Sequence, residues 1–104
     1  MISPPIISPQ QVLSLLSGRR FRLDNEKALQ RGIADLFLST GFTEGTDYTR
    51  EYRLTNKDIP DFYFHSQKIV IEIKVKGQAR AIYAQCVRYC DHADVNQLLL
   101  ITNK

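Results

Sequence analysis

Two carboxylates and a lysine stand close together in the segment IPDFYFHSQKIVIEIKVKG, residues 59–77. Asp61 follows a proline, and Glu72 and Lys74 lie two residues apart on a run rich in isoleucine. Mg²⁺ is commonly bound by one or two carboxylates together with water and substrate phosphate, and an ammonium group can stabilise charge that develops during a reaction. These residue types therefore suggest metal-assisted chemistry at a phosphate. The alternative is a surface hairpin with a few solubilising charges.

The apolar pattern of this segment predicts a β-hairpin with a defined register. A turn centred between Ser66 and Gln67 places Asp61 opposite Glu72, and opposed residues share a face of the sheet. One face is then entirely apolar, with Phe62, Phe64, Ile69, Ile71, Ile73 and Val75. The other face carries Asp61, Tyr63, Val70, Glu72, Lys74 and Lys76. A slip of one residue would mix the two sets, so the register is strongly specified.

This register sets up an electrostatic conflict between Asp61 and Glu72. Directly opposed residues have Cβ atoms about 5 Å apart, and two carboxylates at that separation repel, so one of them tends to keep its proton. A divalent cation would remove the conflict. A surface pair screened by Lys74 and Lys76 remains the competing interpretation.

The elements that must position these residues can be read along the chain. Helices are expected over residues 8–17, where Ser8 serves as N-cap, and over residues 25–40, which Gly41 terminates. Strands are expected over 48–54, 61–64, 69–75 and 97–102, and a further helix over 79–91. The last strand is a continuous apolar run that suits burial on both faces. The fold class is therefore α/β, with a mixed, roughly four-stranded sheet flanked by helices on both faces and a final parallel pair.

Composition restricts the chain to a single small domain. Its 104 residues allow one core, and its net charge of +3 mildly favours a polyanionic partner. We find no secretory signal and no apolar run long enough to span a membrane, so we expect a cytoplasmic protein. Cys86 and Cys90, four apart on the expected helix, are too distant for a disulfide and are interpreted as core residues; a zinc site with His92 would lack a fourth ligand.

The hairpin resembles the signature of the PD-(D/E)xK nuclease superfamily, in which Pro-Asp is followed by a Glu-x-Lys triplet. Here Asp61 is followed eleven residues later by Glu72 and then by Lys74. The helix over 79–91 contains Gln85 and Tyr89, similar to the Gln-x-x-x-Tyr motif of one branch of that superfamily. The resemblance covers about residues 24–102 and implies a restriction-endonuclease-like αβββαβ core over 24–104, preceded by an extra helix and a basic segment over 1–23.

The resemblance also implies roles for individual residues. Mg²⁺ or Mn²⁺ would be bound by Asp61, Glu72, the main-chain carbonyl of Ile73 and, directly or through water, Glu26. Lys74 would position the attacking water, and Gln85 and Tyr89 would contact substrate phosphate. Glu26 is equally explained by the helix macrodipole, and Gln85 and Tyr89 by the boundary of a core.

Several arginines are candidates for phosphate contacts. They are Arg19, Arg20, Arg22, Arg80 and Arg88. Short basic runs bind nucleic acid in many proteins but also occur as solvated surface.

The implied activity is metal-dependent hydrolysis of DNA by a small nuclease of the type found in phages and mobile elements. Because the chain has no room for a separate specificity domain, we expect recognition of DNA structure, such as a junction, flap or nick, rather than of sequence. A homodimer would supply two cutting sites and cover exposed edges. The alternative is a non-catalytic module for nucleic-acid binding or assembly that keeps the nuclease fold.

Overall fold

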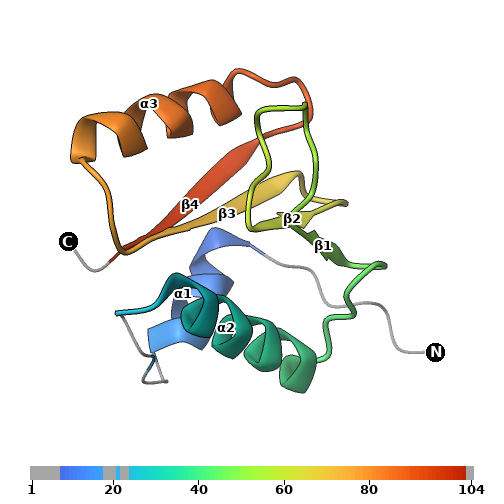
Figure 1. Ribbon diagram of the computed structural model, residues 1–104. Helices are drawn as coiled ribbons and strands as arrows, with labels where there is room; N and C mark the ends of the chain where they lie inside the picture. The colour runs from blue at the N-terminus through green and yellow to red at the C-terminus, as the bar shows by residue number, and fades with distance from the viewer. Residues whose placement is uncertain (1–7, 18–20, 22–23, 103–104) are drawn as a thin grey trace.

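The computed structural model describes residues 8–17, 21 and 24–102 of the chain (Figure 1). The elements are α1 Pro9–Ser17, α2 Glu26–Thr40, β1 Tyr48–Arg50, β2 Phe62–Phe64, β3 Ile69–Lys74, α3 Ala79–Cys90 and β4 Gln97–Thr102. Their order is the one that the sequence predicts. In the part of the chain that the structure describes, no helix has the length and apolar character needed to cross a bilayer.

The four strands form one mixed sheet in the order β1-β2-β3-β4. β1 and β2 are antiparallel, as are β2 and β3, whereas β3 and β4 are parallel. Phe62 pairs with Ile71 and Phe64 with Ile69, so the predicted hairpin register is confirmed. The predicted α/β class with a mixed four-stranded sheet is confirmed as well.

Helices cover both faces of the sheet, with α1 and α2 on one side and α3 on the other (Figure 1). The first side holds the larger core, in which the ring of Phe37 from α2 packs edge-on against Phe62 and Phe64 at centroid distances of 5.5 and 5.2 Å. The α3 side holds a smaller core that includes Tyr63, Val70, Tyr89 and Val95. Because side chains alternate between the two faces along β2 and β3, each of these strands contributes residues to both cores.

The ends of α2 follow from local chemistry. The side chain of Asn25 accepts a hydrogen bond of 3.0 Å from the amide of Ala28, which satisfies one of the free donors of the first turn. Gly41 ends the helix with φ of 104°, a left-handed conformation that glycine adopts without steric cost. The helix that carries Glu26 is therefore fixed at both ends.

Three expectations were wrong. The first strand ends at Arg50 instead of residue 54, because Glu51 adopts φ of 50° and turns the chain away. β4 is an edge strand and is not buried on both faces, since it pairs with β3 and leaves Leu100 39% exposed. Cys90 is exposed and Cys86 half-buried, so the two thiols are not core residues.

Candidate metal-binding active site

β3 presents Glu72 and Lys74 on the same face of the sheet, as expected for residues two apart on a strand. The Glu72 side chain is buried, and the Lys74 ammonium lies 3.2 Å from its Oε2 atom. β3 is held on both sides, by β2 and by β4. This half of the predicted site is therefore built on a central strand.

Asp61 lies one residue before β2 and is joined to β3 by two hydrogen bonds. Its main-chain amide donates to Glu72 Oε1 at 3.2 Å, and its own Oδ2 accepts from the amide of Ile73 at 2.7 Å. Ile73 lies two residues beyond Ile71, whose partner Phe62 begins β2. The main-chain pairing of β2 with β3 ends at Phe62, and the Asp61 carboxylate takes its place by bonding to the Ile73 amide. Asp61 thereby lies beside Glu72, as the register predicts.

The two carboxylates influence each other electrostatically. Burial and, after it, the neighbouring Asp61 charge raise the pKa of Glu72 to about 7, although Lys74 opposes both effects. Burial also raises the pKa of Asp61, against the effects of the Ile73 amide and Lys74. For Lys74, burial lowers the pKa, but the Glu72, Glu26 and Asp61 carboxylates outweigh burial and raise it overall. Near neutral pH the pair therefore holds less than its full negative charge unless a cation compensates it.

Glu26, in the first turn of α2, reaches the end of β3. Its Oε1 atom accepts a hydrogen bond of 2.9 Å from the Val75 amide and a longer one of 3.4 Å from the Lys76 amide. The Glu26 charge contributes to raising the pKa of both Asp61 and Lys74, so it belongs to the same electrostatic group. The structure thus brings Glu26 to the site, where it bonds to the chain just after Lys74.

Gln85 and Tyr89 on α3 bond to each other. The Gln85 amide donates to the Tyr89 hydroxyl at 2.9 Å, and Tyr89 is 0% exposed. Burial raises the pKa of Tyr89, and the charge of Glu72 adds to this effect, so the ring lies within electrostatic reach of the site. Tyr89 is a core residue, and Gln85 is half-buried.

Of the predicted arginines, the two that the structure describes, Arg80 and Arg88, make no contact with the carboxylates of the site. Arg88 is bound to Asp58, with Nε and Nη2 at 3.0 and 2.9 Å from Oδ1. His92 Nε2 lies 3.0 Å from the other oxygen of Asp58, which is 6% exposed. Arg80 is exposed at the start of α3, and Arg19, Arg20 and Arg22 lie outside the described residues. Arg88 therefore attaches the loop before β2 to α3.

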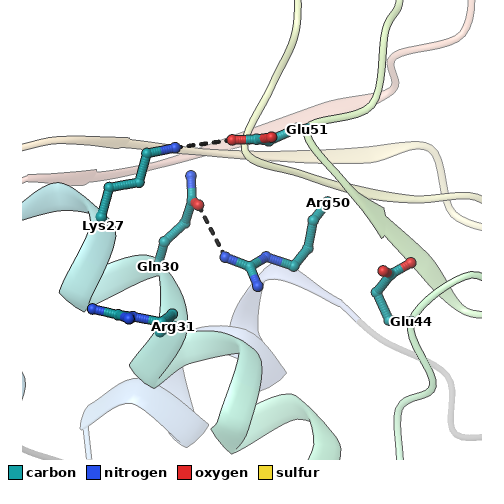
Figure 2. Close-up of a pocket in the computed structure, with 6 residues that line it drawn as sticks. All are labelled: Lys27, Gln30, Arg31, Glu44, Arg50 and Glu51. Atoms are coloured by element: carbon teal, nitrogen blue, oxygen red, sulfur yellow. Dashed lines mark hydrogen bonds and ion pairs between the residues drawn. The ribbon is translucent and has the colours of Figure 1, made fainter.

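Sequence reasoning missed two residues that contact the site, Gln30 and Arg50. Gln30 Nε2 lies 2.6 Å from Asp61 Oδ1, and Arg50 Nη2 lies 3.0 Å from Gln30 Oε1. Both residues line an open pocket of about 570 Å³ (Figure 2). The position of Gln30 could have indicated its role in the site. It stands one helical turn after Glu26, beside the apolar stripe of α2.

The donor set at this site suits a hard divalent cation with few protein ligands. Each oxygen of an ionised carboxylate has more than one acceptor position, so Asp61 and Glu72 keep capacity beyond the hydrogen bonds described. Mg²⁺ retains several waters and binds through one or two carboxylates. Within the described parts of the chain, no cluster of three or more His, Cys, Asp or Glu side chains is arranged to hold a metal ion, so Glu26 does not join Asp61 and Glu72 in a three-carboxylate cluster.

Comparison with known proteins gives no relative from which a function can be transferred. No protein-family model matches the chain, and neither the curated proteins nor the solved structures contain a significant match.

Proposed function

We propose that the protein is a metal-dependent nuclease of the PD-(D/E)xK type with a restriction-endonuclease-like fold, and that it hydrolyses DNA. The observation that carries the proposal is the meeting of Asp61, Glu72 and Lys74 where β2 and β3 pair. Burial raises the pKa of both carboxylates, the charge of Asp61 also raises that of Glu72, and a lysine stands beside Glu72. Perturbed titratable groups of this kind concentrate at functional sites.

In this proposal each side chain has a distinct task. Asp61 and Glu72, with the main-chain carbonyl of Ile73, hold Mg²⁺ or Mn²⁺, which lowers the pKa of bound water and neutralises charge on the phosphate. Lys74, which contacts Glu72, would orient the attacking water and stabilise negative charge on the oxygens of the phosphate. Glu26 holds the chain at Val75, directly after the lysine, and would take part in metal binding only through water.

Cleavage assays on labelled junction, flap, nicked, single-stranded and duplex DNA with Mg²⁺ or Mn²⁺ test this function. Wild type is expected to cut at least one structured DNA, and Asp61→Asn and Lys74→Ala to lose about 100-fold or more of the rate. Lys76→Ala is the matched control, because this exposed lysine stands two residues beyond Lys74. Wild type that cuts none of these substrates, or an equally active Asp61→Asn, would refute the proposal.

One observation weakens the predicted substrate contacts, and the alternative function is a non-catalytic module for nucleic-acid binding or assembly that keeps the fold. Arg88 and Tyr89, both expected at the substrate, are engaged in contacts within the protein. A binding module predicts that wild type and Asp61→Asn bind the same DNA equally well in a gel-shift assay, with no cleavage by either.

We also propose a homodimer that buries the free edge of β4. An apolar pocket of about 460 Å³ lies between α3 and β4, lined in part by Ile82, Tyr83, Leu98 and Leu100. Tyr83 is 71% exposed beside it. Exposed strand edges and apolar patches are usually covered in native assemblies. Sedimentation equilibrium at micromolar concentration is expected to give a dimer, and a monomer there would contradict this part of the proposal.

A further inference from the structure

We infer that Gln30 is a positioning residue for the Asp61 carboxylate and that Arg50 fixes the orientation of the Gln30 amide. The inference rests on the proposed function, because the carboxylate that these two residues position is a proposed metal ligand. It follows from a chain of two hydrogen bonds, Arg50 to Gln30 at 3.0 Å and Gln30 to Asp61 at 2.6 Å.

The direction of this chain is determined by what each group can donate. A guanidinium has only donors, whereas a glutamine amide has one oxygen acceptor and one NH₂ donor. The Gln30 oxygen must therefore face Arg50, and its NH₂ group must face Asp61. The flipped amide would place NH₂ against guanidinium and oxygen against carboxylate, so both contacts would become repulsive. Arg50 thus selects the amide orientation that can hold Asp61.

The surroundings of Gln30 make the contact persistent. Gln30 is only 4% exposed, so water has little access to replace its hydrogen bonds. Arg50 is itself held, because it ends β1 opposite Phe62 and its guanidinium carbon lies 5.9 Å from the Phe62 ring centre. Figure 2 shows Arg50 reaching Gln30 from across the pocket. This relay of hydrogen bonds therefore runs from Arg50 of β1 through Gln30 of α2 to Asp61.

Asp61 is consequently fixed at both of its carboxylate oxygens. Oδ1 is bound by Gln30 of α2, and Oδ2 by the amide of Ile73 in β3. Two contacts from two different elements define the plane of a carboxylate, whereas a single contact would leave it free to rotate about that contact. Groups that orient a ligand in this way affect metal affinity without touching the ion.

Two measurements on the full chain test the inference. The first is Mn²⁺ affinity, measured by calorimetry, for wild type, Gln30→Met, Arg50→Met and the double variant. Methionine preserves length and apolar volume but cannot make either hydrogen bond. We expect Gln30→Met to weaken Mn²⁺ binding by about 10- to 100-fold, Arg50→Met to weaken it less, and the double variant to match Gln30→Met. Arg31→Met, which removes another arginine of the same pocket, should bind Mn²⁺ like wild type.

The second measurement needs no metal. In ¹H–¹⁵N spectra of the metal-free protein, the Gln30 side-chain amide should give shifted, slowly exchanging signals that change in both Asp61→Asn and Arg50→Met but not in Arg31→Met. Unchanged Gln30 signals in either variant overturn the inference, whether or not the protein binds metal. Additive effects of the two methionine substitutions, or equal Mn²⁺ affinity of Gln30→Met and wild type, overturn it as well. Wild type that binds no Mn²⁺ but shows the expected amide signals refutes the metal-site proposal and leaves the relay standing.

Discussion

The carboxylate of Glu26 accepts a hydrogen bond of 2.9 Å from the main-chain amide of Val75, 49 residues further along the chain. This bond joins the first turn of α2 to the residue after β3. The lysine of the predicted site is the last residue of that strand. An interaction outside the sheet therefore fixes the position at which Lys74 leaves it.

Substitution of Glu26 should separate this structural role from a role at the metal. Glu26→Ala leaves the Val75 amide without its acceptor and should lower the free energy of unfolding by about 1–2 kcal/mol. Glu26→Gln keeps an accepting oxygen and should stay within about 0.5 kcal/mol of wild type, yet lose nuclease rate if the charge serves the metal. Urea unfolding measures the stabilities. An alanine variant as stable as wild type would show that the bond is unimportant.

Glu72 should make the protein less stable as pH rises. Its pKa in the folded protein is about 7, against 4.5 for an ordinary glutamate. Because the pKa is higher in the folded protein, protonated Glu72 contributes to the free energy of unfolding. This contribution is complete below about pH 4.5 and is lost as pH rises through about 7. Glu72→Gln avoids this loss and should be the more stable protein at pH 8, by up to about 3 kcal/mol. Thermal unfolding at pH 5 and pH 8 measures the difference, and a gap that does not widen with pH would contradict it.

Divalent metal should reverse the same instability. A ligand that binds only the folded state at 100 times its Kd stabilises it by about 2.7 kcal/mol. We therefore expect Mg²⁺ or Mn²⁺ to raise the Tm of wild type relative to EDTA and to leave Asp61→Asn unchanged. NaCl at matched ionic strength is the control for general screening. An equal rise in both proteins would place the ion elsewhere.

Asp58 should join the loop before β2 to α3 in a pH-dependent way, through its contacts with Arg88 and His92. The hydrogen bond from His92 lowers its pKa, and so do the contacts with Arg88. The pKa of Asp58 in the folded protein is below its ordinary value of 3.8. The ionised carboxylate therefore stabilises the fold fully above pH 3.8, and this stabilisation is lost as pH falls through the folded-state pKa. Asp58→Asn should therefore be destabilised by about 1–3 kcal/mol at pH 6.5, with a difference that shrinks as pH falls below 3.8. Unfolding curves on either side of pH 3.8 test this, and a constant difference would refute it.

Tyr89→Phe should affect stability and leave DNA affinity unaltered. The hydroxyl is buried against Gln85, so its loss should lower the free energy of unfolding by about 1 kcal/mol. Because Tyr89 is 0% exposed, the substitution should not alter KM for DNA. A raised KM with unchanged stability would instead support the predicted contact between Tyr89 and the substrate phosphate.

The hairpin could be predicted from sequence because its rule is local. Alternation of apolar residues admits one register, and that register brings Asp61 to Glu72. The helix ends at Asn25 and Gly41 follow equally local rules of capping. Most of the element order and the centre of the site are therefore determined by short stretches of chain.

The supporting contacts could not be predicted because they depend on how distant elements dock. Arg50 meets Gln30 across 20 residues, and Gln30 meets Asp61 across 31. Arg88 looked like a phosphate ligand because charge alone does not reveal a buried aspartate on a loop 30 residues away. The exposure of Leu100 likewise depends on β4 being at the edge of the sheet, which a continuous apolar run does not indicate.

The central position of β3 gives the two halves of the site different mobility. Glu72 and Lys74 lie on the central strand, beyond its pairing with β2 but within its pairing with β4, so their amides should exchange with solvent only when β3 and β4 separate. Asp61 lies outside the strands, at the end of the loop that runs from Glu51, and side-chain contacts hold it. Such segments open locally at lower free energy. If the site opens, we therefore expect the loop to withdraw Asp61 while the strand keeps the glutamate and the lysine in place.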